Sequence, residues 1–438
     1  MDRISFLPDA LRLRILEFLP IEDAIATGVL SKRWENLWCS LTIINFHQPT
    51  FERRSRGKRD FKDFVYQTLV LRDGSHIDKF TLSVDLDDLS TIHVNSWISF
   101  VVNRGVKEFH LSVLYGKLNR KLHWCLFTCK SLRVLTLDNV DLVLPSNMGF
   151  PRLETLKLME VKFYDENLTN QLFSSCPSLV ELFISNCDLN NVRVLRIIGS
   201  KLKFLVMLCS YPIPDVEITA SCLHELEYFG YPPIISSETL SSLLRVGLRI
   251  VSLSSIINAR RDMFYRRASD IMMGLHNVVE MALQGFFIEF LTRVQDSLAC
   301  LPTYDSLEHL HLDMYPTKNQ VQVIILLLRN FPNLKHLRIQ VQQHMPAVRL
   351  NMDEGCRSLE LSSEYSLKHL KKVDIESFEG TQKELDLVRF LLENADAIEK
   401  LNIVYTSQEM VDFLSQVSVQ EKIESFSKAS SNVVVSIS

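Results

Sequence analysis

The sequence predicts an α/β protein in which three short N-terminal helices precede a solenoid built from one recurring strand. The first forty-six residues contain three short segments with helical apolar periodicity. From about residue 106 onward a leucine pattern recurs, and several segments between its copies have helical periodicity. No single copy can bury its own leucines, so the copies are expected to stack into a parallel sheet with right-handed crossovers. An ordinary α/β sheet is the alternative, but such folds seldom repeat one strand pattern so literally.

The composition is that of a globular protein with protein partners. Of 438 residues, 47% are hydrophobic and 23% are charged. The formal net charge of −4 favours neither nucleic acid nor an anionic membrane as a partner. Nine cysteines without a C-x-x-C pair argue against a disulfide framework. The N-terminus lacks the apolar stretch of a signal peptide, and no apolar run is long enough to span a membrane, so the nucleus and/or the cytoplasm is the expected location.

The N-terminal segments predict helices over 7–19, over 21–27 and from Ser31 onward. Pro20 ends the first helix, and Ser31 is a good N-cap for the third. At about 100° per residue the first helix has apolar residues on more than one side. One stripe holds Leu7, Leu11, Ile15, Phe18 and Leu19, while Leu13 and Leu16 project elsewhere. Pattern alone leaves two interpretations open, a module that needs a partner and a cap for the following domain.

Residues 1–46 resemble the F-box of plant F-box proteins. The motifs are Ile4-Ser5-x-Leu7-Pro8-Asp9-x-Leu11, Ile15-Leu16-x-Phe18-Leu19-Pro20, Asp23-Ala24 and Val29-Leu30-Ser31-Lys32-Arg33-Trp34-x-x-Leu37-Trp38. The resemblance implies docking to the Skp-type adaptor of an SCF ubiquitin ligase and, through it, to a cullin-RING ligase. It places ten residues in or near the adaptor-binding surface: Leu7, Pro8, Ile15, Leu16, Leu19, Pro20, Val29, Leu30, Ser31 and Trp34. Which of them face the adaptor and which fill the local core stays open.

Residues 106–364 are predicted to form leucine-rich repeats in a horseshoe-like solenoid. The clearest copy, Leu179-x-x-Leu182-x-Ile184-x-x-Cys187-x-Leu189, fits the full repeat pattern. Copies that start at 132, 153, 179, 202 and 223 are spaced for a strand and a return. Helical returns are expected at 168–173, 271–275 and 321–328. The pattern leaves the repeat boundaries near 232–277 and 341–365 open.

Residues 47–105 are predicted to be a linker and the N-terminal part of the repeat body. Phe61-x-x-Phe64-Val65-x-x-x-Leu69-x-Leu71-Arg72-Asp73 and Ile77-Asp78-Lys79-Phe80-Thr81-Leu82 resemble the segment that follows the F-box in the same plant family. A basic run precedes them and is expected to be a solvated loop, with a nuclear-import signal as the alternative. It consists of Arg53, Arg54, Arg56, Lys58, Arg59 and Lys62.

Residues 365–438 resemble the FBD domain that ends many plant F-box/LRR proteins. The motifs are Leu367-Lys-His-Leu370-Lys-Lys-Val373-x-Ile375-x-x-Phe378-x-Gly380, Val388-x-x-Leu391-Leu392-Glu393-Asn394-Ala395 and Ile398-x-Lys400-Leu401-x-Ile403. The tail Phe426-Ser-Lys-Ala-Ser430 departs from the family in one place, since Lys428 stands where Arg is usual. Apart from the resemblance, the pattern predicts two further strand repeats joined by an amphipathic helix near 382–394.

No motif for catalysis, a cofactor or a metal stands out in the sequence. The glycines include no G-x-G, and HExxH, GxSxG and CxxC are absent. His309 and His311 share one face of a strand, but no third metal ligand is adjacent, so a plain surface pair is favoured. We therefore expect a non-catalytic substrate receptor of an SCF ligase. The alternative is a leucine-rich-repeat scaffold that acts without ubiquitin ligation.

The strand pattern also predicts where a protein substrate binds. In each copy the leucines point inward, so residues between them face outward on the concave sheet. Equivalent central positions belong to Thr136, Lys157, Phe183, Val206, Glu227, His311, Arg338 and Asn402, with His309 and His336 beside two of them. Outward apolar and Arg side chains are common binding hot spots, so the candidate substrate-binding residues are Phe183, Val206, His311 and Arg338. The alternative is a sheet face exposed to solvent with no binding role. The sequence does not identify the substrate.

Overall fold

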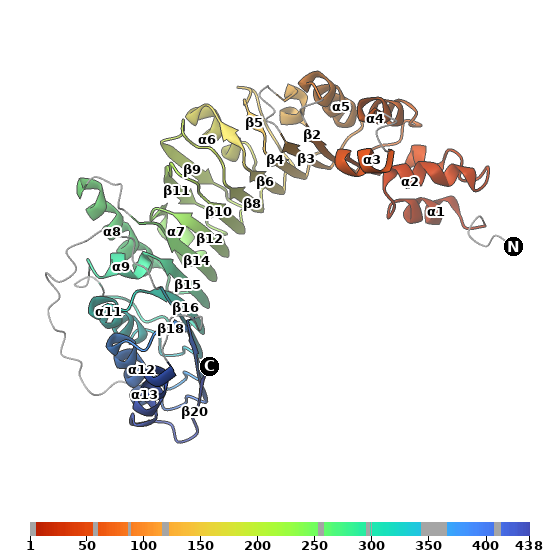
Figure 1. Ribbon diagram of the computed structural model, residues 1–438. Helices are drawn as coiled ribbons and strands as arrows, with labels where there is room; N and C mark the ends of the chain where they lie inside the picture. Colours follow the sequence, from red (N-terminus) through yellow and green to blue (C-terminus); the bar gives the residue numbers. More distant parts are fainter. Residues whose placement is uncertain are drawn as a thin grey trace. The chain divides into compact units, whose positions relative to one another are not determined.

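The predicted α/β class is confirmed, since strands from successive segments of the chain pair in parallel and alternate with helical or irregular returns (Figure 1). The computed structural model describes residues 6–55, 60–85, 89–115, 122–252, 258–294, 298, 300–342, 366–406 and 413–438. The chain divides into two compact units, Met1–Ala220 and Ser221–Ser438. No helix in the described ranges has both the length and the apolar character needed to cross a membrane.

The N-terminal region is less regular than the sequence predicts. Helix α1 covers Asp9–Leu16, shorter than the predicted 7–19, and α2 covers Ile21–Ala26. Two 3₁₀ turns follow, η1 (Thr27–Val29) and η2 (Leu37–Ser40). The predicted α-helix from Ser31 is wrong. Backbone hydrogen bonds there join residues three apart, as in Trp34 N–H to Ser31 O, and this is 3₁₀ rather than α geometry.

A buried arginine holds this N-terminal region together. Arg12 is only 2% exposed, and its guanidinium donates to the backbone oxygens of Leu7 and Arg33 and to the carboxylate of Asp9. The same group lies 5.5 Å from the centroid of the Trp34 ring, a cation–π contact. One side chain therefore joins the start of α1 to the turn that follows Ser31.

The repeat sheet of the first unit begins earlier than residue 106. Its strands are parallel neighbours in the order β1 (Ile43–His47), β2 (Lys79–Asp85), β3 (Glu108–Tyr115), β4 (Val134–Asp138), β6 (Thr155–Met159), β8 (Glu181–Ser185) and β10 (Phe204–Leu208). Isoleucine and phenylalanine occupy interior positions of β1 and β2, which a search for leucines passes over.

Helical returns connect the first strands. They are α3 (Gln48–Ser55), α4 (Phe61–Val70), α5 (Thr91–Asn103) and the 3₁₀ turn η3 (Trp124–Thr128). The expected solvated loop is therefore partly wrong, because Arg53 and Arg54 belong to α3 and Lys62 to α4. The rest of that basic run, 56–59, lies outside the described residues.

Later returns in the first unit add short strands of their own. β5 (Asp141–Leu142) pairs with β7 (Lys162–Phe163), and β9 (Val194–Ile198) pairs with β11 (Asp215–Thr219). The predicted helix at 168–173 is confirmed as α6 (Glu166–Ser174), which begins at the N-cap Asp165.

A left-handed residue follows each of three successive repeat strands. Asn139, Glu160 and Asn186 come directly after β4, β6 and β8 and have φ of 54°, 52° and 51°. The N–H of each donates to the last residue of the next strand in the sheet, at 2.9, 2.9 and 3.0 Å. The same backbone device thus ends each strand and ties it to its neighbour.

The second unit continues the pattern. Its strands are parallel neighbours in the order β12 (Glu225–Gly230), β14 (Arg245–Ile250), β15 (Glu280–Gly285), β16 (His309–Met314), β17 (His336–Val341), β18 (Lys372–Phe378), β19 (Lys400–Tyr405) and β20 (Val434–Ile437). Helices α7 (Ser237–Ser242), α8 (Asn258–Gly274), α9 (Phe287–Leu291), α11 (Lys318–Leu328), α12 (Gln382–Asn394) and α13 (Phe413–Glu424) lie on one side of these strands (Figure 1).

Most predicted helices of the second unit are confirmed. The return at 321–328 is α11, and the helix near 382–394 is α12, which begins with a Thr381–Glu384 capping box. The short helix expected at 271–275 is the end of the longer α8. Of the two unexplained stretches, 232–277 contains the repeat strand β14, whereas 343–365 of the second lies outside the described residues.

The repeated leucines form the core, as predicted. Leu135, Leu156, Leu182 and Leu205 are neighbours in register on four adjacent strands, and each is at most 2% exposed. Burial of one such side chain stabilises the fold by about 1.5–3 kcal/mol. The eight described cysteines are free, and burial raises the pKa of Cys176 to about 12, so its thiol is a neutral core group.

Gly285 generates a stability prediction. It ends β15 with φ of +64°, and an added Cβ would collide with the carbonyl oxygen of Ile250. We expect Gly285→Ala to lower the free energy of unfolding by about 1–3 kcal/mol, measured by chemical denaturation. Gly149→Ala is the control, since no atom lies within 4 Å of its added Cβ. Equal stability of the two variants would contradict the assignment of strain.

Candidate interaction surfaces

Large apolar side chains are exposed across the N-terminal region. Val29 is 89% exposed, Phe18 84%, Phe6 77% and Leu30 65%. Several large exposed apolar side chains within one short region are typical of an interaction site in soluble proteins. The N-terminal apolar surface is defined here by Phe6, Leu11, Ile15, Phe18, Leu19, Val29 and Leu30.

The structure separates the ten sequence-predicted adaptor residues into three groups, which are buried, half-buried and exposed. Leu16 and Trp34 are 0% and 3% exposed and belong to the local core. Leu7 and Ser31 are half-buried. The remaining six are exposed, namely Pro8, Ile15, Leu19, Pro20, Val29 and Leu30. Sequence reasoning omitted Phe6, Leu11 and Phe18 from the site, although the helical stripe that contains Leu11 and Phe18 was a sufficient signal.

Polar contacts fix the N-terminal helices against the first strands of the sheet. The Thr42 hydroxyl donates to Glu17 at 3.1 Å, and Arg54 in α3 pairs with Asp23 in α2 at 2.7 Å. A cleft lies at this junction and is lined by Phe18, Leu19 and Pro20 on one side and by Ile43 and His47 of β1 on the other. The N-terminal apolar surface therefore reaches the edge strand of the sheet.

The outward positions of the sheet form the register that the sequence predicts. In the first unit, Thr136, Lys157, Phe183 and Val206 are successive partners on β4, β6, β8 and β10. Beside them, all three outward residues of β10 are apolar. These side chains form what is called here the apolar rung patch: Met159, Phe183, Phe204, Val206 and Leu208, each half-buried.

In the second unit, the outward positions carry charged and polar side chains. His311, Arg338, Asp374 and Asn402 are successive partners on β16 to β19. The pattern missed four other rungs at this level, which are Gly247, Ala282, Asp374 and Ser436. Glycine and alanine carry no signal of their own, and Asp374 lies in the FBD-like segment.

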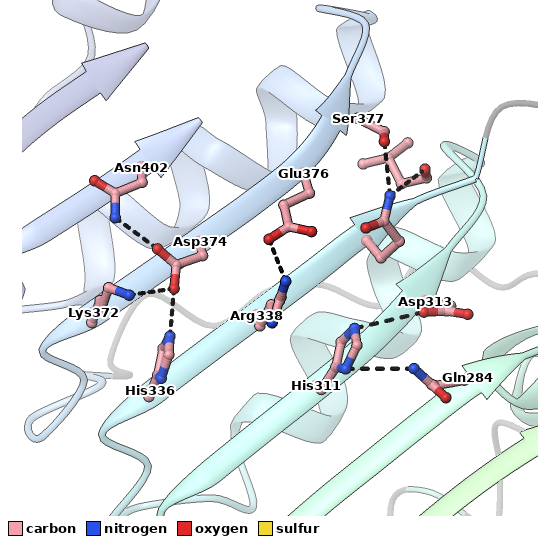
Figure 2. A network of polar contacts seen from close by, with 12 residues as sticks. Gln284, His311, Asp313, His336, Arg338, Lys372, Asp374, Glu376, Ser377 and Asn402 are labelled. Carbon is pink, nitrogen blue, oxygen red and sulfur yellow. Dashed lines mark hydrogen bonds and ion pairs between the residues drawn. The ribbon is translucent and has the colours of Figure 1, made fainter. Parts of the chain in front are cut away.

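Asp374 is the centre of a hydrogen-bonded network (Figure 2). Its carboxylate accepts from His336 at 2.6 Å, from Lys372 at 2.7 Å and from Asn402 at 2.7 Å. Arg338, the registered partner of Asp374, donates to Glu376 on the next outward level at 2.6 Å. A partner that engages Arg338 must share it with Glu376 or displace that carboxylate.

His311 has weaker contacts than its neighbours. Its Nδ1 lies 3.5 Å from the Gln284 amide, and its Nε2 lies 3.8 Å from Asp313, beyond hydrogen-bond distance (Figure 2). Burial lowers the pKa of His311, which favours the neutral ring. Across the described ranges, no three His, Cys, Asp or Glu side chains gather in a group that could hold a metal ion.

The network around Asp374 predicts a pH dependence of stability. Burial alone would raise the pKa of Asp374, but the hydrogen bonds from Lys372, Asn402 and His336 together lower it. A carboxyl whose pKa is lowered in the folded state stabilises that state at pH values above its unfolded pKa of about 3.9. This contribution to stability is lost as the pH falls through the folded-state pKa.

We therefore expect the unfolding free energy of Asp374→Asn to fall less between pH 7 and pH 3 than that of wild type, in urea titrations at both pH values. Asp305→Asn is the control, because that side chain is exposed and outside the network. Identical acid sensitivity of wild type and Asp374→Asn would contradict the role of the network.

Comparisons with known proteins match both surfaces to known domains. The family model described as the F-box domain matches residues 4–45, and the model described as At1g61320/AtMIF1, LRR domain, matches residues 70–436. Among curated proteins, the chain is 27% identical to F-box/FBD/LRR-repeat protein At5g56420 of Arabidopsis thaliana, over 90% of this chain and 89% of the relative. It is 28% identical to F-box/LRR-repeat protein 13 of the same plant, over 92% and 89%.

The matched ranges coincide with the described architecture. The F-box match covers the region that carries the N-terminal apolar surface, and the repeat match covers every strand from β2 to β20 except the last residue. The repeat model alone spans more than half of the 438 residues. The chain belongs to the plant F-box/FBD/LRR-repeat protein family.

Proposed function

We propose that this chain is the substrate-recognition subunit of an SCF-type cullin-RING ubiquitin ligase. Its F-box docks a Skp-type adaptor, and its leucine-rich repeats bind a protein substrate. The observation that carries the proposal is the N-terminal apolar surface, which lies in the F-box and stays exposed in the folded chain. The transfer chemistry belongs to the RING subunit and its ubiquitin-conjugating partner, so this chain acts without catalysis, in the nucleus or the cytoplasm.

Energetics support adaptor docking. Full burial of a single Leu, Val or Phe side chain contributes about 1.5–3 kcal/mol, and seven such side chains form the exposed surface. A helical region of roughly forty residues also lies at the lower limit for independent stability. A partner that covers this surface would bury the exposed apolar side chains and stabilise the helical region.

The outward face of the repeat sheet is the proposed substrate site. The apolar rung patch around Phe183 and Val206 offers apolar surface that a partner can bury. In the second unit, Arg338 and His311 offer directional polar contacts. Apolar and Arg anchors ringed by polar groups are typical of binding hot spots. Each of the two sets is a candidate anchor in its own unit.

A scaffold that works without ubiquitin ligation is the second candidate function. The repeat face would serve such a scaffold equally well. Adaptor binding discriminates between the two, because a scaffold has no need of the exposed F-box surface.

The first prediction for this function concerns the adaptor. We expect Val29→Asp to abolish co-purification of a Skp-type adaptor in a pull-down, because the charge would have to be buried in the interface. The double variant Leu7→Ala, Pro8→Ala should also lose the adaptor. Both full-length variants should melt within a few degrees of wild type, since Val29 and Pro8 are exposed and Leu7 is half-buried.

A matched control is Tyr66→Asp. Tyr66 is 63% exposed on α4, outside the F-box, so its variant should bind the adaptor normally. Undiminished adaptor binding by Val29→Asp would remove the ligase proposal and leave the scaffold.

The second prediction concerns the substrate. Partners are captured on the full-length Val29→Asp chain, which is expected to bind substrates without delivering them for ubiquitination. In that background, Phe183→Asp and Arg338→Glu should each reduce capture of at least one partner by about tenfold or more, the loss of a typical hot spot. Quantitative mass spectrometry of the captured proteins measures the effect.

Two substitutions on other surfaces serve as controls. Ile198→Asp changes an apolar residue that is 53% exposed on β9, outside the repeat sheet, and Arg152→Glu changes an exposed cation. Both should retain all partners. If Phe183→Asp and Arg338→Glu also retain every partner, the outward sheet face is not the recognition surface, and the stretch near 232–277 becomes the better candidate.

A further inference from the structure

Arg72 is a buried cation with hydrogen-bond donors that no described residue accepts. It follows α4 and is only 7% exposed. Its Nε and Nη2 atoms are buried and make no hydrogen bond to any described residue. Burial, opposed in part by the neighbouring Asp73, lowers the pKa of Arg72. A guanidinium in this state has strong donors that the described fold leaves unused.

The adjacent carboxylate does not use these donors. One oxygen of Asp73 accepts from the Ser40 hydroxyl and the other accepts from the Ser75 N–H at 2.9 Å. These contacts tie the loop after α4 to η2, the last turn of the F-box region. Asp73 thus lowers the local positive charge but does not accept from Nε or Nη2 of Arg72.

A second guanidinium with an unused donor among the described residues lies close by. Arg104 is the C-cap of α5, which packs beside α4, and its Nη1 is likewise buried without a hydrogen bond (Figure 1). Its guanidinium stacks on the ring of Phe100, 4.8 Å from the centroid, so one face is fixed. Arg104 is near enough to act on Arg72 as a like charge.

Backbone acceptors nearby are already engaged. The carbonyls of Val101 and Val102 at the end of α5 accept from the turn that follows, and the carbonyl of Arg104 accepts from the Ile77 N–H at 3.2 Å. With two cations and one carboxylate, the cluster of Arg72, Asp73 and Arg104 keeps a net charge of about +1. The missing component is negatively charged and accepts hydrogen bonds.

We propose that Arg72 and Arg104 bind a small oxyanion, a phosphate or a carboxylate, at the junction between the F-box and the repeat sheet. The planar fork of a guanidinium matches the oxygen spacing of both groups. The deep burial of Arg72 limits the occupant to a small group. By joining the loop after α4 to the end of α5, the anion would stabilise the segment on which the F-box is mounted.

Melting of the full-length chain tests this site, whether or not the adaptor is bound. Inorganic phosphate and acetate are titrated in separate arms at constant ionic strength, with chloride as the balancing anion. We expect a saturable rise in Tm with at least one of the two probes. A rise with phosphate alone identifies a phosphoryl group, and a rise with acetate alone identifies a carboxylate.

Three variants make the result specific. Arg72→Met and Arg104→Met should each lose the anion-dependent rise, while Arg152→Met, which removes an exposed cation elsewhere, should keep it. Arg104 is only partly buried, so its variant remains informative if Arg72→Met fails to fold. The proposal is overturned if neither probe raises the Tm of wild type, as expected where water alone solvates Arg72, or if the rise persists in Arg104→Met.

Discussion

Each strand of the repeat sheet can bury its interior side chains only against the strands on either side of it. Leu156 on β6, for example, lies in register between Leu135 and Leu182. All three side chains are buried beside one another. This mutual dependence fixes the register of the strands, since a shift by one residue would turn every interior leucine outward. It also determines the outward rungs, and with them the surface that the repeats offer to a partner.

The parts of the fold that obey this constraint with leucine were predictable from sequence. The registers of β4, β6, β8, β10 and β12 follow from the leucine period, as does the helix α12 from its amphipathic pattern. The repeat pattern was harder to detect in β1 to β3, because Phe80 and Phe109 occupy leucine positions. It was also harder to detect in β14, which Gly247 interrupts. The apolar period could not predict the 3₁₀ geometry after Ser31, because α and 3₁₀ turns place Trp34 on a similar face.

The candidate surfaces show the same division. Period predicts that Phe183 and Arg338 face outward, and the structure has them on the outward rungs. Period does not reveal that Arg338 is paired with Glu376, 38 positions later, because partners across parallel strands are set by the return length. Nor does it distinguish Leu16, which is fully buried in the F-box, from Leu19, which is 38% exposed.

The left-handed residues after β4, β6 and β8 separate the sheet from the segments that return to it. Because Asn139, Glu160 and Asn186 each end a strand with a backbone hydrogen bond to the next, the pairing is complete before the return begins. Insertions and deletions in the returns therefore leave the register of the strands unchanged. Repeats in such a chain can lengthen or shorten on one side during evolution while the opposite face keeps its spacing, so new loops can appear without loss of an existing binding surface.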